Sequence, residues 1–156
     1  MSETAEILVR PGEPDDHAFV MATWLRAFRH GSLHGKRLTN DVYFTNHHPL
    51  VTDIVARSEV WVAALPDDPR VIIGYLVTEH QGHVPVLHFA YTKDAFRRMR
   101  VFTQLREAAG LPLALMGVEV SHPTFDWLEF LAPKYPGARS NPYRWQYAPK
   151  EAHAPA

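Results

Sequence analysis

Apolar residues recur at helical spacing in the first third of the chain and at strand spacing after residue 58. From His17 to Gly31 they recur every three or four positions, as on one face of a helix. A second helical stretch runs from Asp41 to Val55, where Pro49 predicts a kink or two short helices. The polar segment 30–40 between them contains two glycines and predicts a loop.

Strand patterns dominate the middle of the chain. β-branched and aromatic residues predict strands at 60–65, 71–78 and 84–92, separated by the turn sequences PDDPR and QG. A short strand at 6–10 precedes the first helix. The predicted order begins with a strand, two helices and three further strands.

The last third of the chain alternates helices and strands. Asp94 is placed to cap a helix that continues to Ala109 and that Gly110 ends. An apolar run then predicts a buried strand at 113–120, followed by a helix at 122–134 and a strand at 142–148. We expect one α/β domain over residues 1–148 and a disordered tail at 149–156.

Composition excludes several classes of protein. The chain has 156 residues, a formal net charge of −1 and no cysteine, which removes disulfide frameworks, thiolate metal sites and cysteine nucleophiles. Its longest apolar runs are far shorter than the roughly 18 to 20 residues of a membrane span. The acidic N-terminus is unlike a signal peptide, so we expect a cytoplasmic protein.

Several segments resemble one known family in their order and spacing. ILVRPGEPDDHAFVMATWL and VWVAALPDDPRVIIGYLVTE resemble the first strand and helix and the central hairpin of the GCN5-related N-acetyltransferases (GNAT). ATWLRAF, YFTNHH, VLHFAYTKDAFRR and SNPYRW resemble small proteins of this fold from bacteriophages and prophages. The resemblance covers residues 6–148 and implies a mixed central sheet with helices on both faces. A phage-encoded protein would lie in the host cytoplasm.

The resemblance implies an acyl transfer from acetyl-CoA to a primary amine. Acetyl-CoA would lie between the fourth and fifth strands, with its pantetheine on the backbone of Phe89, Ala90, Tyr91 and Thr92. Its pyrophosphate would bind backbone amides at the start of the next helix, where the helix dipole favours an anion. The amine would attack the thioester carbonyl, assisted by a general base and an oxyanion-stabilising amide. The sequence does not indicate which amine is the acceptor.

The phosphate-binding loop departs from the family pattern. That pattern is Arg or Gln, two variable residues, Gly, one variable residue, then Gly or Ala. This chain has Arg97, Arg98, Met99, Arg100, Val101 and Phe102. Arg100 could add a cation near the phosphates while Phe102 packs inward, or the two side chains could close the loop. Closure would leave a catalytically silent protein of this fold, acting as a binding or assembly module.

Histidines are the candidate bases. His88 lies two residues from Ala90 in the same predicted strand, so we expect both on one face, and a neutral imidazole there could accept the proton of the amine. The alternative is a buried imidazole satisfied by a backbone carbonyl. His47 or His48 could join His88, or could cap or cover the end of the second helical stretch.

The general acid is a second departure. Many family members place a tyrosine in the helix after the fifth strand, but this chain has none there before Tyr135. Tyr135 or Tyr143 could serve as the general acid if the fold brings its hydroxyl to the space between the fourth and fifth strands. The alternative is a packing role for both side chains.

Other ligands are less well supported. The ten histidines include no HExxH motif, and the adjacent His47 and His48 point in different directions on a helix, so we predict no metal site. The basic run of Lys93, Arg97, Arg98, Arg100 and Arg106 could meet nucleic acid, but such a run is usually a solvated face. An exposed sheet edge makes a homodimer plausible.

Overall fold

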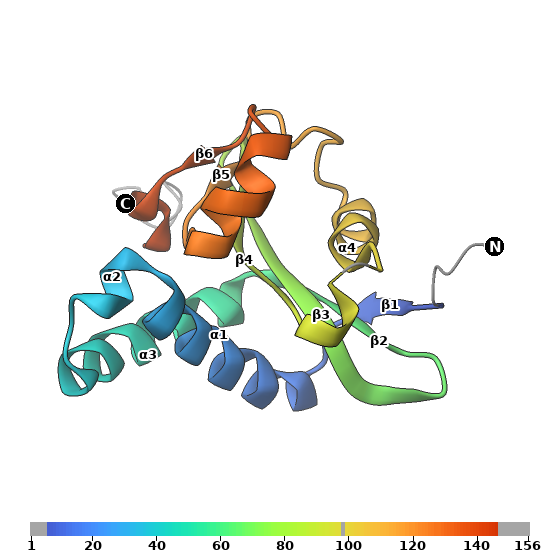
Figure 1. The fold of residues 1–156 in the computed structure, drawn as a ribbon, viewed down its shortest axis with the longest axis horizontal. Helices are drawn as coiled ribbons and strands as arrows, with labels where there is room; N and C mark the ends of the chain where they lie inside the picture. Colours follow the sequence, from blue (N-terminus) through green and yellow to red (C-terminus); the bar gives the residue numbers. More distant parts are fainter. Residues whose placement is uncertain (1–5, 98, 147–156) are drawn as a thin grey trace, which may run out of the picture.

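A single mixed sheet organises the protein. The structure is a computed structural model that describes residues 6–97 and 99–146 (Figure 1). Six strands lie side by side in chain order: β1 (Leu8–Pro11), β2 (Glu59–Leu65), β3 (Asp68–Gln81), β4 (Val84–Thr92), β5 (Glu119–Val120) and β6 (Arg139–Ser140). Pairing is antiparallel from β1 to β4 and parallel for β4–β5 and β5–β6. The predicted α/β class and mixed sheet are confirmed.

Helices cover both faces of the sheet. The α-helices are α1 (His17–Gly31), α2 (Leu33–Lys36), α3 (Asn40–Arg57) and α4 (Val101–Ala109). Figure 1 shows α1 and α3 on one face, and α4 on the other. Single-turn elements complete the chain: the 3-10 helices η1 (Pro14–Asp16), η2 (Asp94–Phe96), η4 (Ala132–Lys134) and η5 (Pro142–Trp145), and the π-helix η3 (Trp127–Leu131).

Each face of the sheet has its own hydrophobic core. The core beneath α1 and α3 includes Trp24, Phe28, Tyr43, Tyr75 and Phe89. The core beneath α4 includes Ile73, Leu76, Leu87, Leu105 and Trp127. Because each large apolar side chain contributes about 1.5–3 kcal/mol when fully buried, these two layers hold the helices to the sheet.

The first two helical regions differ from the sequence prediction in two ways. The segment predicted as a loop contains α2, because Ser32 Oγ accepts a hydrogen bond from the Gly35 amide and caps one helical turn. Pro49 does not divide the second helical region, which is the single helix α3. One face of α3 is buried on both sides of Pro49, so tertiary packing outweighs the lost backbone hydrogen bond.

Two predicted elements near α4 are wrong in extent. The helix expected from Asp94 is divided into η2 and α4, because Arg100 adopts a left-handed backbone conformation. Gly110 ends α4 as predicted, also with a left-handed backbone. The strand expected at 113–120 contains only β5, because Leu115 and Gly117 have positive φ angles that an extended strand does not allow.

The C-terminal third is less regular than predicted. The helix predicted at 122–134 is mainly the π-helix η3 followed by η4. The strand predicted at 142–148 is wrong where it can be checked: Pro142 to Trp145 form η5, and the last strand is β6. The Asn141 side chain accepts from the Tyr143 amide and caps this turn. Residues 147–148 and the predicted disordered tail lie outside the described residues.

Candidate functional site: a fork between two parallel strands

β4 and β5 pair briefly and then separate. Only Val86 and Leu87 of β4 pair with β5, and the Ser121 amide adds one more bond to the Leu87 carbonyl, 3.1 Å away. β4 continues to Thr92 and stays paired with β3, while the segment that follows β5 turns away from β4 after Ser121. We call this opening the fork, with residues 89–92 on one arm and residues 122–126 on the other. The fork lies between the fourth and fifth strands, where the family resemblance implies that acetyl-CoA would bind.

The loop after β4 leads from the fork to the N-terminus of α4. Arg100 is the N-cap residue of α4, with φ 60° and ψ 32°. The first backbone hydrogen bond of the helix runs from the Gln104 amide to the Arg100 carbonyl, at 3.1 Å. The preceding amides of Val101, Phe102 and Thr103 therefore have no acceptor within α4, as at any helix start, and they suit an anion.

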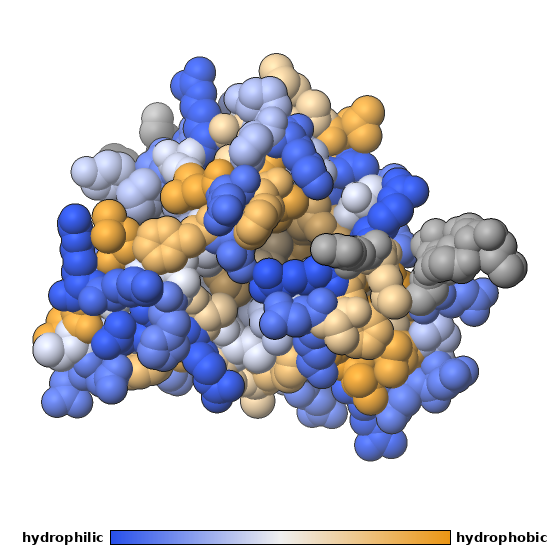
Figure 2. Space-filling model, viewed as in Figure 1, coloured by the Kyte–Doolittle hydropathy of each residue, from blue (hydrophilic) through white to orange (hydrophobic). Residues whose placement is uncertain are grey.

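Side chains bridge the fork. Phe102 of α4 makes edge contacts with Trp127 and Tyr135, at ring-centroid distances of 6.4 and 5.8 Å. Arg97, after β4, donates to a carboxylate oxygen of Asp126 on the other arm, at 3.1 Å. Figure 2 shows apolar side chains near the centre of the face of the molecule that it draws. A ligand in the fork would therefore displace or pass beside these bridges.

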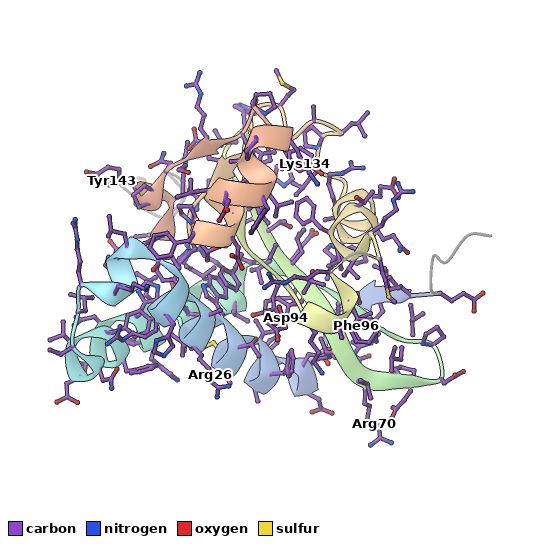
Figure 3. The ribbon with its side chains drawn as sticks, viewed as in Figure 1. Arg26, Arg70, Asp94, Phe96, Lys134 and Tyr143 are labelled. Carbon is purple, nitrogen blue, oxygen red and sulfur yellow. The ribbon has the colours of Figure 1, made fainter. Side chains whose placement is uncertain are left out.

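The predicted cofactor-binding residues lie together along the fork. Phe89 is buried and stacks on Trp24, while Ala90, Tyr91 and Thr92 are half-buried. Asp94 and Phe96 of the following loop and Lys134 beyond η3 lie on opposite sides of the opening (Figure 3). The rest of the predicted set follows in the loop and α4: Arg97, Met99, Arg100, Val101 and Phe102. Arg98 lies outside the described residues.

His88, the predicted base, is completely buried. Its ring Nδ1 lies 2.7 Å from Ser121 Oγ, and its Nε2 lies 2.8 Å from Glu79 Oε1. It is the extra residue of a β-bulge, since Leu87 pairs with Thr78 and Phe89 pairs with Val77. The bulge turns His88 to the α1–α3 side, whereas Ala90 packs on the α4 side, so the expected shared face is wrong. His88 can act on a substrate only through its bonded partners.

His88 belongs to a buried polar chain. We use this name for Arg57, Glu79, His88, Ser121, His122 and His47. The buried polar chain starts at Arg57 of α3 and crosses β3 and β4. It then passes through Ser121, where β4 and β5 separate, and returns to α3 at His47. Trp145 stacks on His122 at 4.7 Å, and its indole N–H donates to the Ser121 carbonyl.

Burial lowers the pKa of the three imidazoles in the buried polar chain, those of His47, His88 and His122. The pKa of His47 falls to about 4, from burial and then from neighbouring His34. The pKa of His122 lies well below its usual value for the same reason, with further repulsion from His47, His88 and His34. Burial lowers the pKa of His88 more than the adjacent Glu79 raises it. These rings are therefore neutral at pH 7.

Glu79 is the carboxylate of the chain. Burial acts to raise its pKa, but hydrogen bonds from His88, Gln81 and Arg57 outweigh burial and hold the pKa below its usual value. Arg57 Nε donates to Glu79 Oε2 at 2.8 Å, and Gln81 Nε2 donates to Oε1 at 3.0 Å. Glu79 is therefore ionised at neutral pH and can only accept hydrogen bonds.

The other predicted catalytic residues lie apart from His88. His48 is exposed on α3, whereas its neighbour His47 points inward to His122, at 2.9 Å between the Nε2 atoms. Tyr135 is half-buried and stacks on Trp127, so it lies beside the fork in the aromatic bridge. Tyr143 is 89% exposed on η5. The structure thus brings Tyr135, and neither His48 nor Tyr143, to the fork.

Glu79 and Ser121 were missed by the sequence reading. Glu79 follows the apolar run of β3 on the face that Val77 buries, and a charged residue at such a position signals a buried partner. Ser121 directly follows β5 and precedes His122. Its importance depends on the β4–β5 pairing, which the sequence pattern did not locate.

The basic run does not form one solvated face. Arg106 is buried, and its guanidinium donates to the Leu111 carbonyl at 3.3 Å. Arg97 pairs with Asp94 and Asp126, and Lys93 lies over the Phe19 ring. Of the described members of this run, Arg106 therefore does not belong to a solvated face, whereas Arg97 and Arg100 are exposed.

Among the described residues, no group of three or more His, Asp or Glu side chains is placed to hold a metal ion. No helix in the described part of the chain is long and apolar enough to cross a membrane. An open cavity of about 540 Å³ lies between the start of β1 and α4, lined by Glu6, Ile7, Leu8, Pro66, Arg100, Thr103, Gln104 and Glu107. None of these residues lies on β4 or β5.

The fold is that of the GCN5-related N-acetyltransferases. A GCN5-related N-acetyltransferase from Rhodopseudomonas palustris aligns with 86% of this chain and 83% of its own, with a TM-score of 0.55 and 15% identity. A possible acetyltransferase from Clostridium difficile 630 aligns with 81% of this chain and 84% of its own, with a TM-score of 0.50 and 14% identity.

More distant matches add no detail. YjaB from Escherichia coli is 20% identical with a TM-score of 0.47, and 67% of this chain aligns with 64% of YjaB, less than two thirds of its length. No family model and no curated protein matches the sequence. At such identities a shared fold does not define an activity, so the function is argued from the fork itself.

Proposed function

We propose that the protein transfers an acetyl group from acetyl-CoA to a primary amine, with the donor held in the fork. The observation that carries this proposal is that β4 separates, after Ser121, from the segment that follows β5. Residues 89–92 then present one strand edge that neither β5 nor the chain after it pairs in the described residues. A strand edge of this kind can bond the amide groups of an extended ligand.

The start of α4 would hold the diphosphate of the donor. The amides of Val101, Phe102 and Thr103 have no acceptor within α4, and the side chain of Arg100 is exposed beside them. The left-handed conformation of Arg100 supports this assignment, because the family pattern has glycine at that position. The residues present therefore fit the donor along its backbone contacts.

The bridges across the fork favour a second candidate, a silent protein of the same fold. Phe102 stands where the family pattern has Gly or Ala, and its contacts with Trp127 and Tyr135 join α4 to the chain after β5. If these contacts stay closed, the donor cannot enter and the protein would serve as a binding or assembly module. A phage or prophage origin and a cytoplasmic location belong to the same proposal and rest on the sequence alone.

Replacing Phe102 separates the two candidates. Phe102→Ala removes the aromatic bridge and restores a small residue, so we expect acetyl-CoA to bind about tenfold more tightly, or about 1.4 kcal/mol. Binding is measured by calorimetry, and thiol release is followed with a panel of primary amines. Phe130→Ala is the matched control, because Phe130 is an aromatic residue of η3 that is 56% exposed.

The two candidates predict different results. The enzyme is supported if the parent protein transfers acetyl groups and if Phe102→Ala, but not Phe130→Ala, binds acetyl-CoA more tightly than the parent does. Absence of binding by both the parent and Phe102→Ala at millimolar acetyl-CoA rejects the enzyme and leaves the silent module.

A further inference from the structure

We propose that His47, His122, Ser121 and His88 form a proton relay that ends at the carboxylate of Glu79. The relay rests on the proposed function, because the proton it carries is the one that an amine acceptor must lose. Its four links measure 2.9 Å (His47 to His122), 3.0 Å (His122 to Ser121), 2.7 Å (Ser121 to His88) and 2.8 Å (His88 to Glu79). All four are hydrogen-bond distances, and all five residues are buried.

Glu79 sets the direction of every hydrogen bond. An ionised carboxylate has no hydrogen to donate, so His88 must donate from Nε2 to Glu79. A neutral His88 then has a lone pair at Nδ1, which accepts from the Ser121 hydroxyl.

The same logic continues beyond Ser121. Since the Ser121 hydrogen points to His88, its oxygen accepts from His122 Nδ1. Neutral His122 is left with a lone pair at Nε2, which accepts from His47 Nε2. Each hydrogen therefore points toward Glu79, and the lowered pKa values keep all three rings neutral.

A chain with this polarity can pass one proton toward Glu79, after which its hydrogen bonds point the other way. A proton added at His47 Nδ1 lets each member pass its own hydrogen to the next, until Glu79 becomes a carboxylic acid. Glu79, the most exposed of the five residues, then releases the proton to solvent, while Arg57 stays a cation that only donates to Glu79. The charged and titratable groups that face the relay are His34 from α2, Tyr43 and Arg57 from α3, Glu79 from β3 and Arg144 from η5.

The entry lies at His47, the relay member nearest the surface at the end far from Glu79. The His47 ring centroid is 5.6 Å from that of His34, which is exposed on α2. A protonated amine near this end gives one proton to His47 as its nitrogen forms the new C–N bond and the C–S bond breaks. The leaving thiolate takes a second proton from the nitrogen, and the third stays on the amide. The relay thus carries the one proton that the reaction releases.

Ser121→Ala interrupts the relay at its centre with little change in volume. We expect kcat/KM for acetyl transfer to fall about 100-fold at pH 7, the scale of general-base catalysis. The loss should shrink as the pH rises, because solvent then deprotonates the amine. Ser58→Ala is the control, since the Ser58 hydroxyl is buried without a hydrogen-bond partner in the described structure and lies outside the relay.

Nitrogen-15 NMR of the histidine rings tests the relay without any assay of activity. At pH 7 we expect neutral rings with hydrogen on Nε2 of His47, Nδ1 of His122 and Nε2 of His88. A different tautomer at His122 or His88, or a charged ring, overturns the relay. Identical pH profiles for Ser121→Ala and Ser58→Ala overturn it too. If the parent protein transfers no acetyl group, the proposed function fails, and the tautomers alone then decide whether the directed chain exists.

Discussion

Arg100 has a backbone conformation that glycine adopts more easily than other residues. Its φ of 60° lies in the left-handed region, where a non-glycine residue costs about 1–2 kcal/mol. The turn nevertheless divides η2 from α4 and brings the start of α4 toward the fork. The loop therefore has the conformation that glycine favours, with an arginine in its place.

Replacing Arg100 by glycine should stabilise the protein. We expect Arg100→Gly to raise the free energy of unfolding by about 1 kcal/mol, because glycine adopts positive φ without a clash. Arg100→Ala is the control, since alanine keeps the Cβ atom that causes the cost. Urea denaturation at pH 7 measures both variants, and equal stability of the two would contradict this explanation.

The sequence indicated part of the candidate site at this scale. Its pattern predicted the strand 84–92 and drew attention to His88, because a histidine inside an apolar strand needs a polar partner, whereas the choice of residues 89–92 rested on the family resemblance. It could not show that His88 occupies a bulge, since one extra residue changes the face of a side chain without changing the apolar pattern. The role of Glu79 as that partner followed only from the paired strands.

At the scale of elements, α4 packs unusually close to the sheet. Gly74 of β3 has no side chain, and an added Cβ atom would lie 2.7 Å from the Tyr91 carbonyl oxygen and 2.9 Å from Val101 Cγ1. Both contacts are shorter than atoms allow. Gly74 therefore lets the first turn of α4 sit against β3 and β4 beside the fork.

Adding a methyl group at Gly74 should separate these elements. We expect Gly74→Ala to lower the free energy of unfolding by about 1–3 kcal/mol through overpacking. Gly31→Ala is the control, since its added Cβ would meet only Thr124, at 3.9 Å. Thermal denaturation compares them, and the explanation fails if Gly74→Ala is as stable as the parent.

Elements were predicted best where the apolar period was long. α1 and β4 have the predicted bounds, because each presents a continuous pattern with clear turn residues at its ends. The apolar run at 113–118 misled the prediction, since Leu115 and Gly117 turn the backbone while Leu115 and Val118 remain buried. The run is apolar although only part of it is buried, since Leu113 and Met116 are exposed.

At the scale of the whole molecule, the fork joins the two faces of the sheet. The α4 face supplies the loop and helix start that suit an anion, whereas the α1–α3 face contains the polar chain. Ser121 connects them, because its amide makes the final β4–β5 bond and its hydroxyl lies in the relay. Binding of the donor and removal of a proton would thus meet at one point of the fold.

Backbone amide NMR during an acetyl-CoA titration is the most direct test of this account. We predict saturable binding with the largest shifts at residues 89–92 and 101–103, the strand edge and the start of α4. No shift at millimolar acetyl-CoA would contradict the account, as would shifts confined to the cavity outside α4, at residues 6–8 and Glu107.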